Sequence, residues 1–104
     1  MCESATTVFG LLPEDLQKLR RVFARHPNIE QVILYGSRAK GTYRPGSDID
    51  LTLEGQVSWQ ELQQIEQQLD DLLLPYQIDL SLKQHMQNPD LLAHIEQVGW
   101  CLYP

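Results

Sequence analysis

Apolar residues recur along the chain with two different periods, one typical of helices and the other typical of strands. Spacings of three and four residues predict amphipathic helices over residues 13–25, 58–73 and 88–99. Unbroken β-favouring residues or strict alternation predict strands over residues 31–35, 48–54 and 77–82. The final residues, WCLYP, are interpreted as a short edge strand or a docked tail.

The order helix, strand, strand, helix, strand, helix is typical of an α/β architecture. Residues 38–47 join the first two strands and are too few for a comfortable parallel crossover, so antiparallel pairing is favoured. The connection between the second and third strands contains a whole helix, which allows these strands to be parallel. We therefore expect residues 1–104 to form a single α/β (α+β) domain with a mixed β-sheet flanked by helices.

Residues with capping chemistry mark the ends of the predicted helices. Pro13 suits the first position of a helix, and Ser58 with Glu61 has the spacing of a capping box. Asn88 precedes a proline at the start of the third helix, and Gly99 is a candidate C-cap. These local signals agree with the apolar periods.

The turn after the first strand is a candidate anion site. Gly36 and Ser37 interrupt the strand, and a helical turn starting here would offer backbone N–H groups and a hydroxyl to a phosphate. With antiparallel pairing, Ser37 and Asp48 become neighbours at one end of the sheet. Taken alone, a Gly-Ser pair is most often only a turn.

Three aspartates on the predicted strands form a candidate metal site. Asp48 and Asp50 are two residues apart on one strand, hence on one face, with Cα atoms about 6.5 Å apart. Asp79 lies on the polar face of the third strand, beside Asp50 if the two strands are parallel neighbours. Oxygen ligands of this kind suit Mg²⁺. The alternative is that all three are ordinary solvent-facing residues, although aspartate is depleted in strands.

Composition limits the classes of partner. The chain has 104 residues, 42% of them hydrophobic, with no apolar run long enough for a membrane span, and we expect a cytoplasmic protein. The net charge is −6, and Lys83 is the only basic residue after Arg44, which argues against an extended nucleic-acid footprint. Cys2 and Cys101 have no motif spacing and are assigned no role.

Several other polar and aromatic residues are assigned weaker roles. Arg38 and Lys40 could contact phosphates or form salt bridges that hold the loop. The histidines show no ligand-like spacing and are interpreted as surface or capping residues: His26, His85 and His94. Trp59 and Trp100 are interpreted as packing anchors rather than as a platform for a nucleotide base.

The run GSRAKGTYRPGSDIDL resembles the motif of the DNA polymerase β-like nucleotidyltransferase superfamily, which is Gly-Ser, ten residues, then Asp-x-Asp. Its form is similar to that of the minimal nucleotidyltransferases, which are often encoded beside a HEPN-domain protein. The resemblance extends from about Ile29 to Leu82. It implies the polymerase β-like fold, ATP as a nucleotide triphosphate substrate, and Mg²⁺ as cofactor, with two ions.

The resemblance also implies roles for individual residues. Gly36 and Ser37, with Arg38 beside them, would bind the triphosphate. The metal ligands and catalytic carboxylates would be Asp48, Asp50 and Asp79. Asp79 would in addition help to deprotonate the acceptor hydroxyl.

The function that the resemblance implies is transfer of AMP to a tyrosine hydroxyl of a HEPN-domain toxin by this chain as its antitoxin, the two forming a hetero-oligomer. The chain has no room for a further acceptor-binding domain, so we expect another protein to supply the acceptor. One alternative is a non-catalytic antitoxin module that neutralises its partner by contact alone. The other is a nucleotidyltransferase acting on a small molecule such as an antibiotic.

Overall fold

The computed structural model describes residues 11, 13–41, 48–74 and 76–103. The helices are α1 (Pro13–Ala24), α2 (Ser37–Lys40), α3 (Trp59–Asp71) and α4 (Pro89–Val98), with a 3₁₀ turn at Lys83–His85. The strands are β1 (Ile29–Tyr35), β2 (Ile49–Gly55), β3 (Ile78–Leu82) and β4 (Trp100–Tyr103). All six predicted elements are present, and the last residues of the chain form an edge strand.

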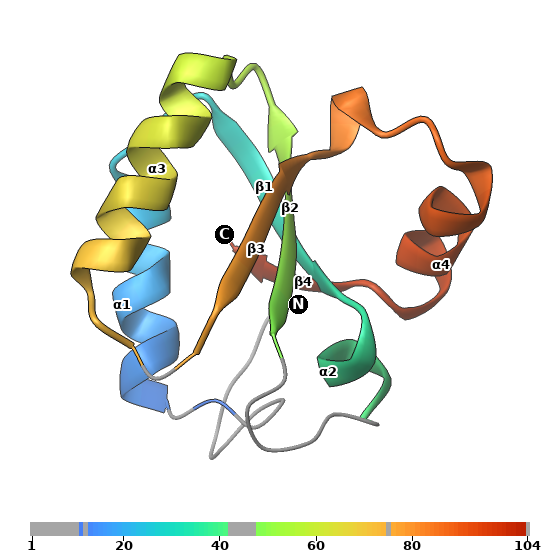
Figure 1. Cartoon of the computed structure of the whole chain (residues 1–104), viewed down its shortest axis with the longest axis horizontal. Coiled ribbons are helices and arrows are strands. Elements are labelled where there is room, and N and C mark those ends of the chain that lie inside the picture. Colours follow the sequence, from blue (N-terminus) through green and yellow to red (C-terminus); the bar gives the residue numbers. More distant parts are fainter. Residues whose placement is uncertain (1–10, 12, 42–47, 75, 104) are drawn as a thin grey trace.

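The four strands form one mixed sheet in the order β3-β2-β1-β4 (Figure 1). β1 pairs antiparallel with both β2 and β4, whereas β2 and β3 are parallel. Tyr35 lies opposite Asp50, and Asp50 lies opposite Asp79. The lengths of the two connections therefore predicted both pairings correctly.

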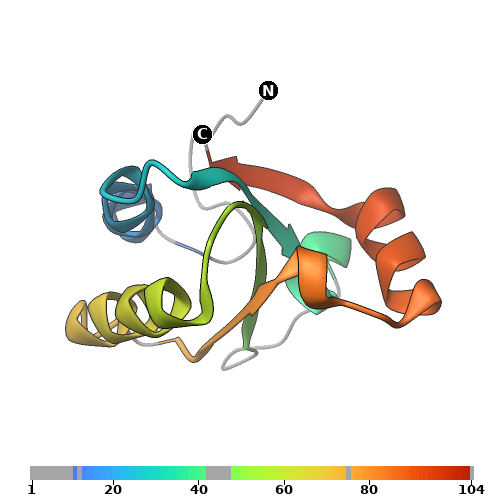
Figure 2. The ribbon, with the colours of Figure 1, turned by 90° about the horizontal axis from the view of Figure 1, so that it is seen from above.

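Helices cover both faces of the sheet. α1 and α3 lie on one face, and α2 and α4 lie on the other, as the view from above shows (Figure 2). The face toward α1 and α3 is apolar, and its strand residues are buried: Val32, Leu34, Ile49, Leu51, Leu53, Leu80 and Leu82. Burying each such side chain stabilises the fold by about 1.5–3 kcal/mol. The opposite face carries polar side chains where β1 ends and β2 and β3 begin.

The predicted caps are largely confirmed. Ser58 Oγ accepts a hydrogen bond from the Glu61 N–H at 3.1 Å, and the Asn88 side chain accepts from two N–H groups of the first turn of α4. Gly99 does end α4, but with φ −59° rather than in a left-handed conformation. The reason for glycine there is space, since an added Cβ would lie 2.2 Å from the carbonyl oxygen of Ile95.

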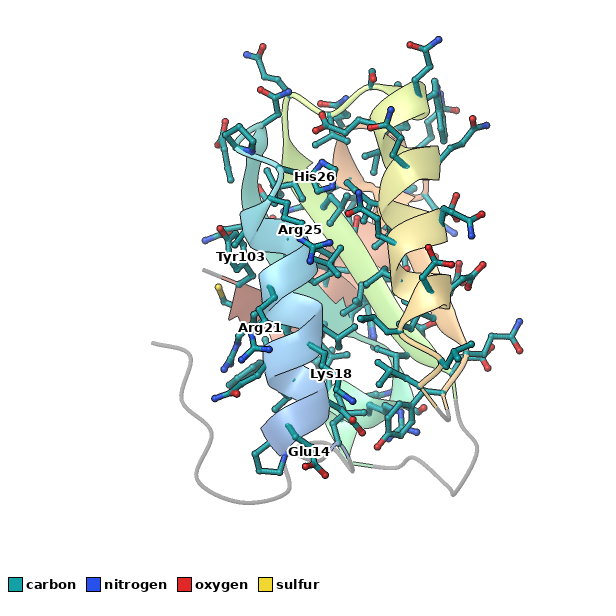
Figure 3. The ribbon with its side chains drawn as sticks, turned by 90° about the vertical axis from the view of Figure 1, so that its left-hand side faces the viewer. Glu14, Lys18, Arg21, Arg25, His26 and Tyr103 are labelled. Atoms are coloured by element: carbon teal, nitrogen blue, oxygen red, sulfur yellow. The ribbon has the colours of Figure 1, made fainter. Side chains whose placement is uncertain are left out.

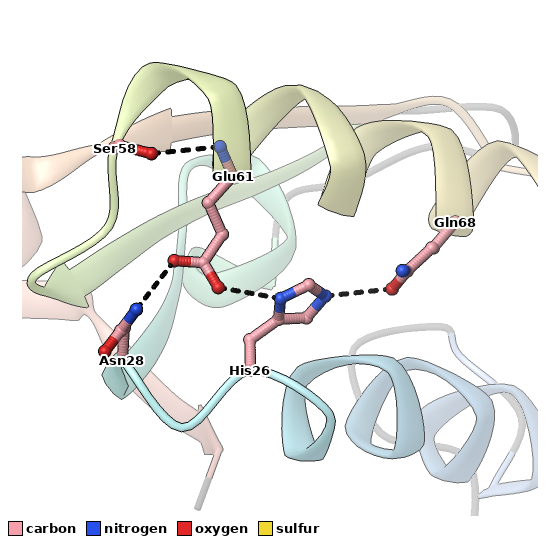
Figure 4. A network of polar contacts seen from close by, with 5 residues as sticks. All are labelled: His26, Asn28, Ser58, Glu61 and Gln68. Atoms are coloured by element: carbon pink, nitrogen blue, oxygen red, sulfur yellow. Dashed lines mark hydrogen bonds and ion pairs between the residues drawn. The ribbon is translucent and has the colours of Figure 1, made fainter.

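His26 is buried, which corrects its assignment to the surface. It points from the end of α1 toward α3, whereas Glu14, Lys18 and Arg21 of α1 lie on the outside of that helix (Figure 3). Its Nδ1 lies 2.9 Å from Glu61 Oε2, and its Nε2 lies 2.9 Å from Gln68 Oε1. Asn28 donates to the other oxygen of Glu61 at 3.1 Å (Figure 4). The network joins the two helices that cover the apolar face of the sheet.

We expect this network to make stability depend on pH. Hydrogen bonds from Asn28 and then His26 lower the pKa of Glu61 below its ordinary value. The stabilisation from ionised Glu61 is therefore complete above the ordinary pKa and is lost as the pH falls through the lowered one. Urea denaturation measures the free energy of unfolding at neutral pH and at about pH 3. Between these two pH values, we expect the free energy of unfolding of Glu61→Gln to fall by about 1 kcal/mol less than that of the wild type.

The control for this prediction is Glu66→Gln, at an exposed position of the same helix. It should follow the wild-type curve. If Glu61→Gln and the wild type show the same pH dependence, the network does not stabilise the fold through an ionised carboxylate.

None of the described helices has the length and apolar character needed to cross a membrane.

Candidate active site

β1 ends in a bend that starts a short helix. Gly36 has φ 80° and ψ −156°, and Ser37 is the first residue of α2. The Lys40 N–H donates to the carbonyl of Gly36 at 3.1 Å, and Gly41 closes the turn in a left-handed conformation. The helical turn expected after Gly36 is therefore present, and it places the Ser37 side chain at the end of the sheet.

Asp50 lies against this bend. A Cβ added to Gly36 would lie 2.2 Å from Asp50 Oδ2 and 3.2 Å from its carboxyl carbon. Position 36 therefore requires glycine for two reasons: φ is positive, and the Asp50 carboxylate occupies the space of a side chain. The Gly-Ser bend and the second aspartate of the motif form one contact surface.

The three aspartates are gathered at the same end of the sheet. Asp48 immediately precedes β2, and Asp50 and Asp79 are in register on parallel neighbours, so their side chains leave the same face. Burial raises the pKa of Asp50, the charges of Asp79 and Asp48 raise it further, and His94 acts in the opposite sense. Asp48 and Asp79 are exposed, so the cluster is open to solvent on one side.

The electrostatics of this cluster favour a cation. Three carboxylates near one another repel, and a hard divalent ion with oxygen ligands relieves that repulsion. Within the described ranges, no three acidic, histidine or cysteine side chains are already arranged as a set of metal ligands. The residue types and their common face suit the oxygen ligands that Mg²⁺ prefers, although the side chains are not already arranged as a ligand set.

His94 belongs to the site, although its sequence position gave no sign of it. Its Nε2 accepts a hydrogen bond from the Gly36 N–H at 3.1 Å, and its ring packs edge-on to Tyr35 with centroids 6.4 Å apart. Its assignment to the surface or a cap is therefore wrong. One consequence is that the Gly36 N–H, expected to face a phosphate, is engaged by α4.

Tyr35 is a second site residue that sequence reasoning missed, because it looked like an ordinary core residue of the strand. Burial raises the pKa of its phenol, the charges of Asp50 and Asp79 raise it further, and a hydrogen bond with Ser81 acts in the opposite sense. The phenol therefore stays protonated at neutral pH. Its uncharged side chain therefore lies beside the carboxylates.

The structure locates Arg38 and contradicts the interpretation of Trp59. Arg38 is buried, with 3% of its surface exposed, and its guanidinium carbon lies 5.3 Å from the centre of the Tyr76 ring. It is therefore fixed beside the bend, and its contact with a phosphate stays a prediction. Trp59 is 59% exposed and stacks on His85, so its assignment as a packing anchor is wrong.

Comparison with known proteins relates this geometry to a family. The chain matches the family Polymerase beta, Nucleotidyltransferase over residues 17–104. No curated protein is a match for it.

Solved structures share the fold. A chain from the crystal structure of a toxin–antitoxin with AMP-PNP superposes with a TM-score of 0.67 at 21% identity, covering 84% of this chain and 71% of that one. The complex of the tri-AMPylated Shewanella oneidensis HEPN toxin with MNT antitoxin gives 0.62 at 17% identity, covering 86% and 69%. A chain from the crystal structure of the MntA–HepT toxin–antitoxin superposes with a TM-score of 0.61 at 17% identity, covering 86% of this chain and 69% of that one.

Proposed function

Because the chain belongs to the polymerase beta nucleotidyltransferase family, we propose that it transfers AMP from ATP to a hydroxyl group of a partner protein in a Mg²⁺-dependent reaction. One observation carries the proposal. The Asp50 carboxylate lies against the Gly36 bend and is in register with Asp79, so a triphosphate held at the bend would reach the acidic cluster.

The proposed metal ligands are Asp48, Asp50 and Asp79, and two ions would be bound. The raised pKa of Asp50 supports this assignment, because a carboxylate crowded by like charges gains most from a bound cation. When bound, Mg²⁺ neutralises the triphosphate and lowers the barrier to its cleavage. Ser37 and Arg38 would position the phosphates next to these carboxylates.

In the proposed step, the acceptor hydroxyl oxygen forms a bond to the α-phosphorus of ATP. The bond between the α-phosphorus and the oxygen that bridges it to the β-phosphorus breaks, and pyrophosphate leaves with that oxygen. The hydroxyl proton passes to Asp79, whose carboxylate is exposed on the outer strand. Most of the rate enhancement would come from positioning and charge neutralisation.

The proposed acceptor is a tyrosine of a HEPN-domain toxin, and this chain would be the cytoplasmic antitoxin of the pair. Support comes from the solved complexes that share the fold, in one of which the HEPN toxin is tri-AMPylated in complex with MNT antitoxin. The acidic net charge of −6 also suits a protein partner better than a nucleic acid.

Incubation of the purified chain with labelled ATP, Mg²⁺ and a co-encoded HEPN protein tests the proposal. We expect label on the HEPN protein, and we expect Asp48→Asn to abolish the transfer while leaving the fold intact, because Asp48 is exposed. Neutralisation of the toxin by Asp48→Asn without any transfer would instead show a binding module. Label found only on a small-molecule acceptor would show the antibiotic-modifying alternative.

A further inference from the structure

A groove of about 730 Å³ runs between α3 and the beginning of β3, on the face of the sheet that α3 covers. A volume of this size is in the range of ligand sites. Its lining is mostly polar and includes Gln63, Glu66, Gln67 and Asp70 of α3 and Gln77 and Ile78 at the start of β3. The groove therefore lies along the outer strand β3, on the face of Ile78 and Leu80, whereas Asp79 projects from the other face.

The outer edge of β3 pairs with no other strand among the described residues. β3 is a terminal strand of the sheet, and the described residues provide no strand on its far side. The carbonyl of Gln77 accepts from the Ile49 N–H, so Gln77, Asp79 and Ser81 turn their backbone groups toward β2. In a parallel ladder the alternate residues face the other way, so the backbone groups of Ile78 and Leu80 point outward.

A strand added at this edge would bring a side chain to the active site. A residue directly opposite Asp79 projects from the same face, with its Cβ about 4.5–5.5 Å from that of Asp79. A hydroxyl-bearing residue at that position would project its side chain from the same face as the Asp79 carboxylate, which is exposed. Edge pairing therefore fixes both the location and the direction of an acceptor side chain.

Leu73 lies next to the groove in the chain and is accessible to a bound segment. It lies between groove residues Asp70 and Leu74, is 88% exposed, and has φ 53°. A left-handed conformation is unfavourable for leucine, and glycine is the usual residue after a helix end. The backbone outlier at an exposed position makes Leu73 a candidate contact residue, which the substitution below tests.

The charge of the groove selects the chemistry of the segment. Two acids, Glu66 and Asp70, line it, and none of the described lining residues is Lys or Arg. The rest of the polar lining consists mainly of glutamine side chains, which hydrogen-bond to peptide groups. A segment with basic residues beside its hydroxyl residue would complement this surface.

We propose that the acceptor protein presents its hydroxyl residue in an extended, basic segment that pairs with the outer edge of β3, with the hydroxyl residue opposite Asp79. The proposal rests on the proposed function, since it names how that acceptor is bound. The edge supplies backbone hydrogen bonds, the acids of α3 attract the flanking basic residues, and Leu73 contacts the segment at the end of the groove.

Binding of short synthetic peptides in the absence of ATP tests the proposal. The probe has one central tyrosine flanked by lysines, and fluorescence polarisation measures its binding. We expect tenfold weaker binding when alternate backbone amides are methylated and when glutamates replace the lysines. Hydrogen exchange should show protection of the Ile78 and Leu80 amides on binding. No binding, or binding insensitive to backbone methylation, would overturn the proposal.

Substitutions with matched controls locate the site. Glu66→Gln combined with Asp70→Asn should weaken binding of the lysine-flanked peptide about tenfold. Glu30→Gln combined with Glu96→Gln removes the same charge from exposed positions outside the groove and should have no effect. Equal effects of the two pairs would show attraction by net charge alone and overturn the proposal.

The substitution Leu73→Gly distinguishes a role of Leu73 in binding the segment from a role in the stability of the fold. It should raise the melting temperature, because glycine tolerates the left-handed conformation, and weaken peptide binding at least threefold. Lower stability with unchanged binding would contradict a contact role. Failure of the two proposals is distinguishable, since transfer to a HEPN protein without β3 protection overturns only edge pairing. Peptide binding at β3 without transfer to any acceptor overturns only the enzymatic function.

Discussion

Asp50→Asn will reduce AMP transfer by about 10³-fold while leaving the melting temperature unchanged or higher. Under the proposed function, activity falls because the amide is neutral at a proposed metal ligand, where it no longer balances the charge of the cation. Stability does not fall, because burial and the charges of Asp79 and Asp48 raise the pKa of Asp50, which means that its ionised form is unfavourable in the fold. Transfer assays and thermal unfolding of the same preparation measure both effects.

The effect of Mg²⁺ on the melting temperature tests whether Asp50 acts as a metal ligand. The wild type should melt at a higher temperature when Mg²⁺ is present, since a ligand that binds the folded state stabilises it. Asp50→Asn should lose that increment, whereas Asp90→Asn, an exposed substitution in the first turn of α4, should keep it. Asp50→Asn with wild-type transfer, or with unfolding at a much lower temperature, would show that Asp50 is a structural residue.

The second large effect is expected from Gly36→Ala, which should destabilise the fold by about 3 kcal/mol and abolish transfer. The backbone there has φ 80°, which costs a non-glycine residue about 1–3 kcal/mol, and the new methyl group would lie 2.2 Å from Asp50 Oδ2. Relief of that contact would move either the bend or the carboxylate. Denaturant unfolding and the transfer assay check the two parts.

Gly41→Ala is the matched control for this substitution. Gly41 has a similar φ of 82°, but no atom of the described residues lies within 4 Å of an added Cβ. Gly41→Ala should therefore lower the free energy of unfolding by only about 1–2 kcal/mol, the penalty for the left-handed backbone. In an Asp50→Ala background the extra cost of Gly36→Ala should shrink toward that of Gly41→Ala. Equal costs of the two glycine substitutions in the wild type would contradict the close contact between the bend and Asp50.

The parts of the fold that depend on local or one-dimensional information could be predicted from the sequence. The cap at Ser58 depends on a residue three positions away, and the pairing of β2 with β3 follows from the length of the helix between them. That pairing is what placed Asp79 beside Asp50. The candidate acidic cluster was therefore accessible from strand order and alternation alone.

Other parts of the site depend on packing between distant elements, for which the sequence carries no visible signal. His94 reaches Gly36 across 58 positions of chain, and His26 meets Glu61 across 35. In the sequence, a single histidine on a helix gives the same pattern whether its side chain faces solvent or contacts a distant bend. Burial of Arg38 over Tyr76 likewise depends on where α2 sits, which apolar periodicity does not encode.

Calorimetric titration of the purified chain with ATP, with and without Mg²⁺, tests the central claim most directly. The claim is that the Gly36–Ser37 bend and the carboxylates of Asp48, Asp50 and Asp79 form one site for a metal-bound triphosphate. It predicts saturable ATP binding that requires Mg²⁺ and that disappears in Asp50→Asn. Absence of binding with the HEPN partner present, or binding unaffected by removal of Mg²⁺ and by Asp50→Asn, would contradict it.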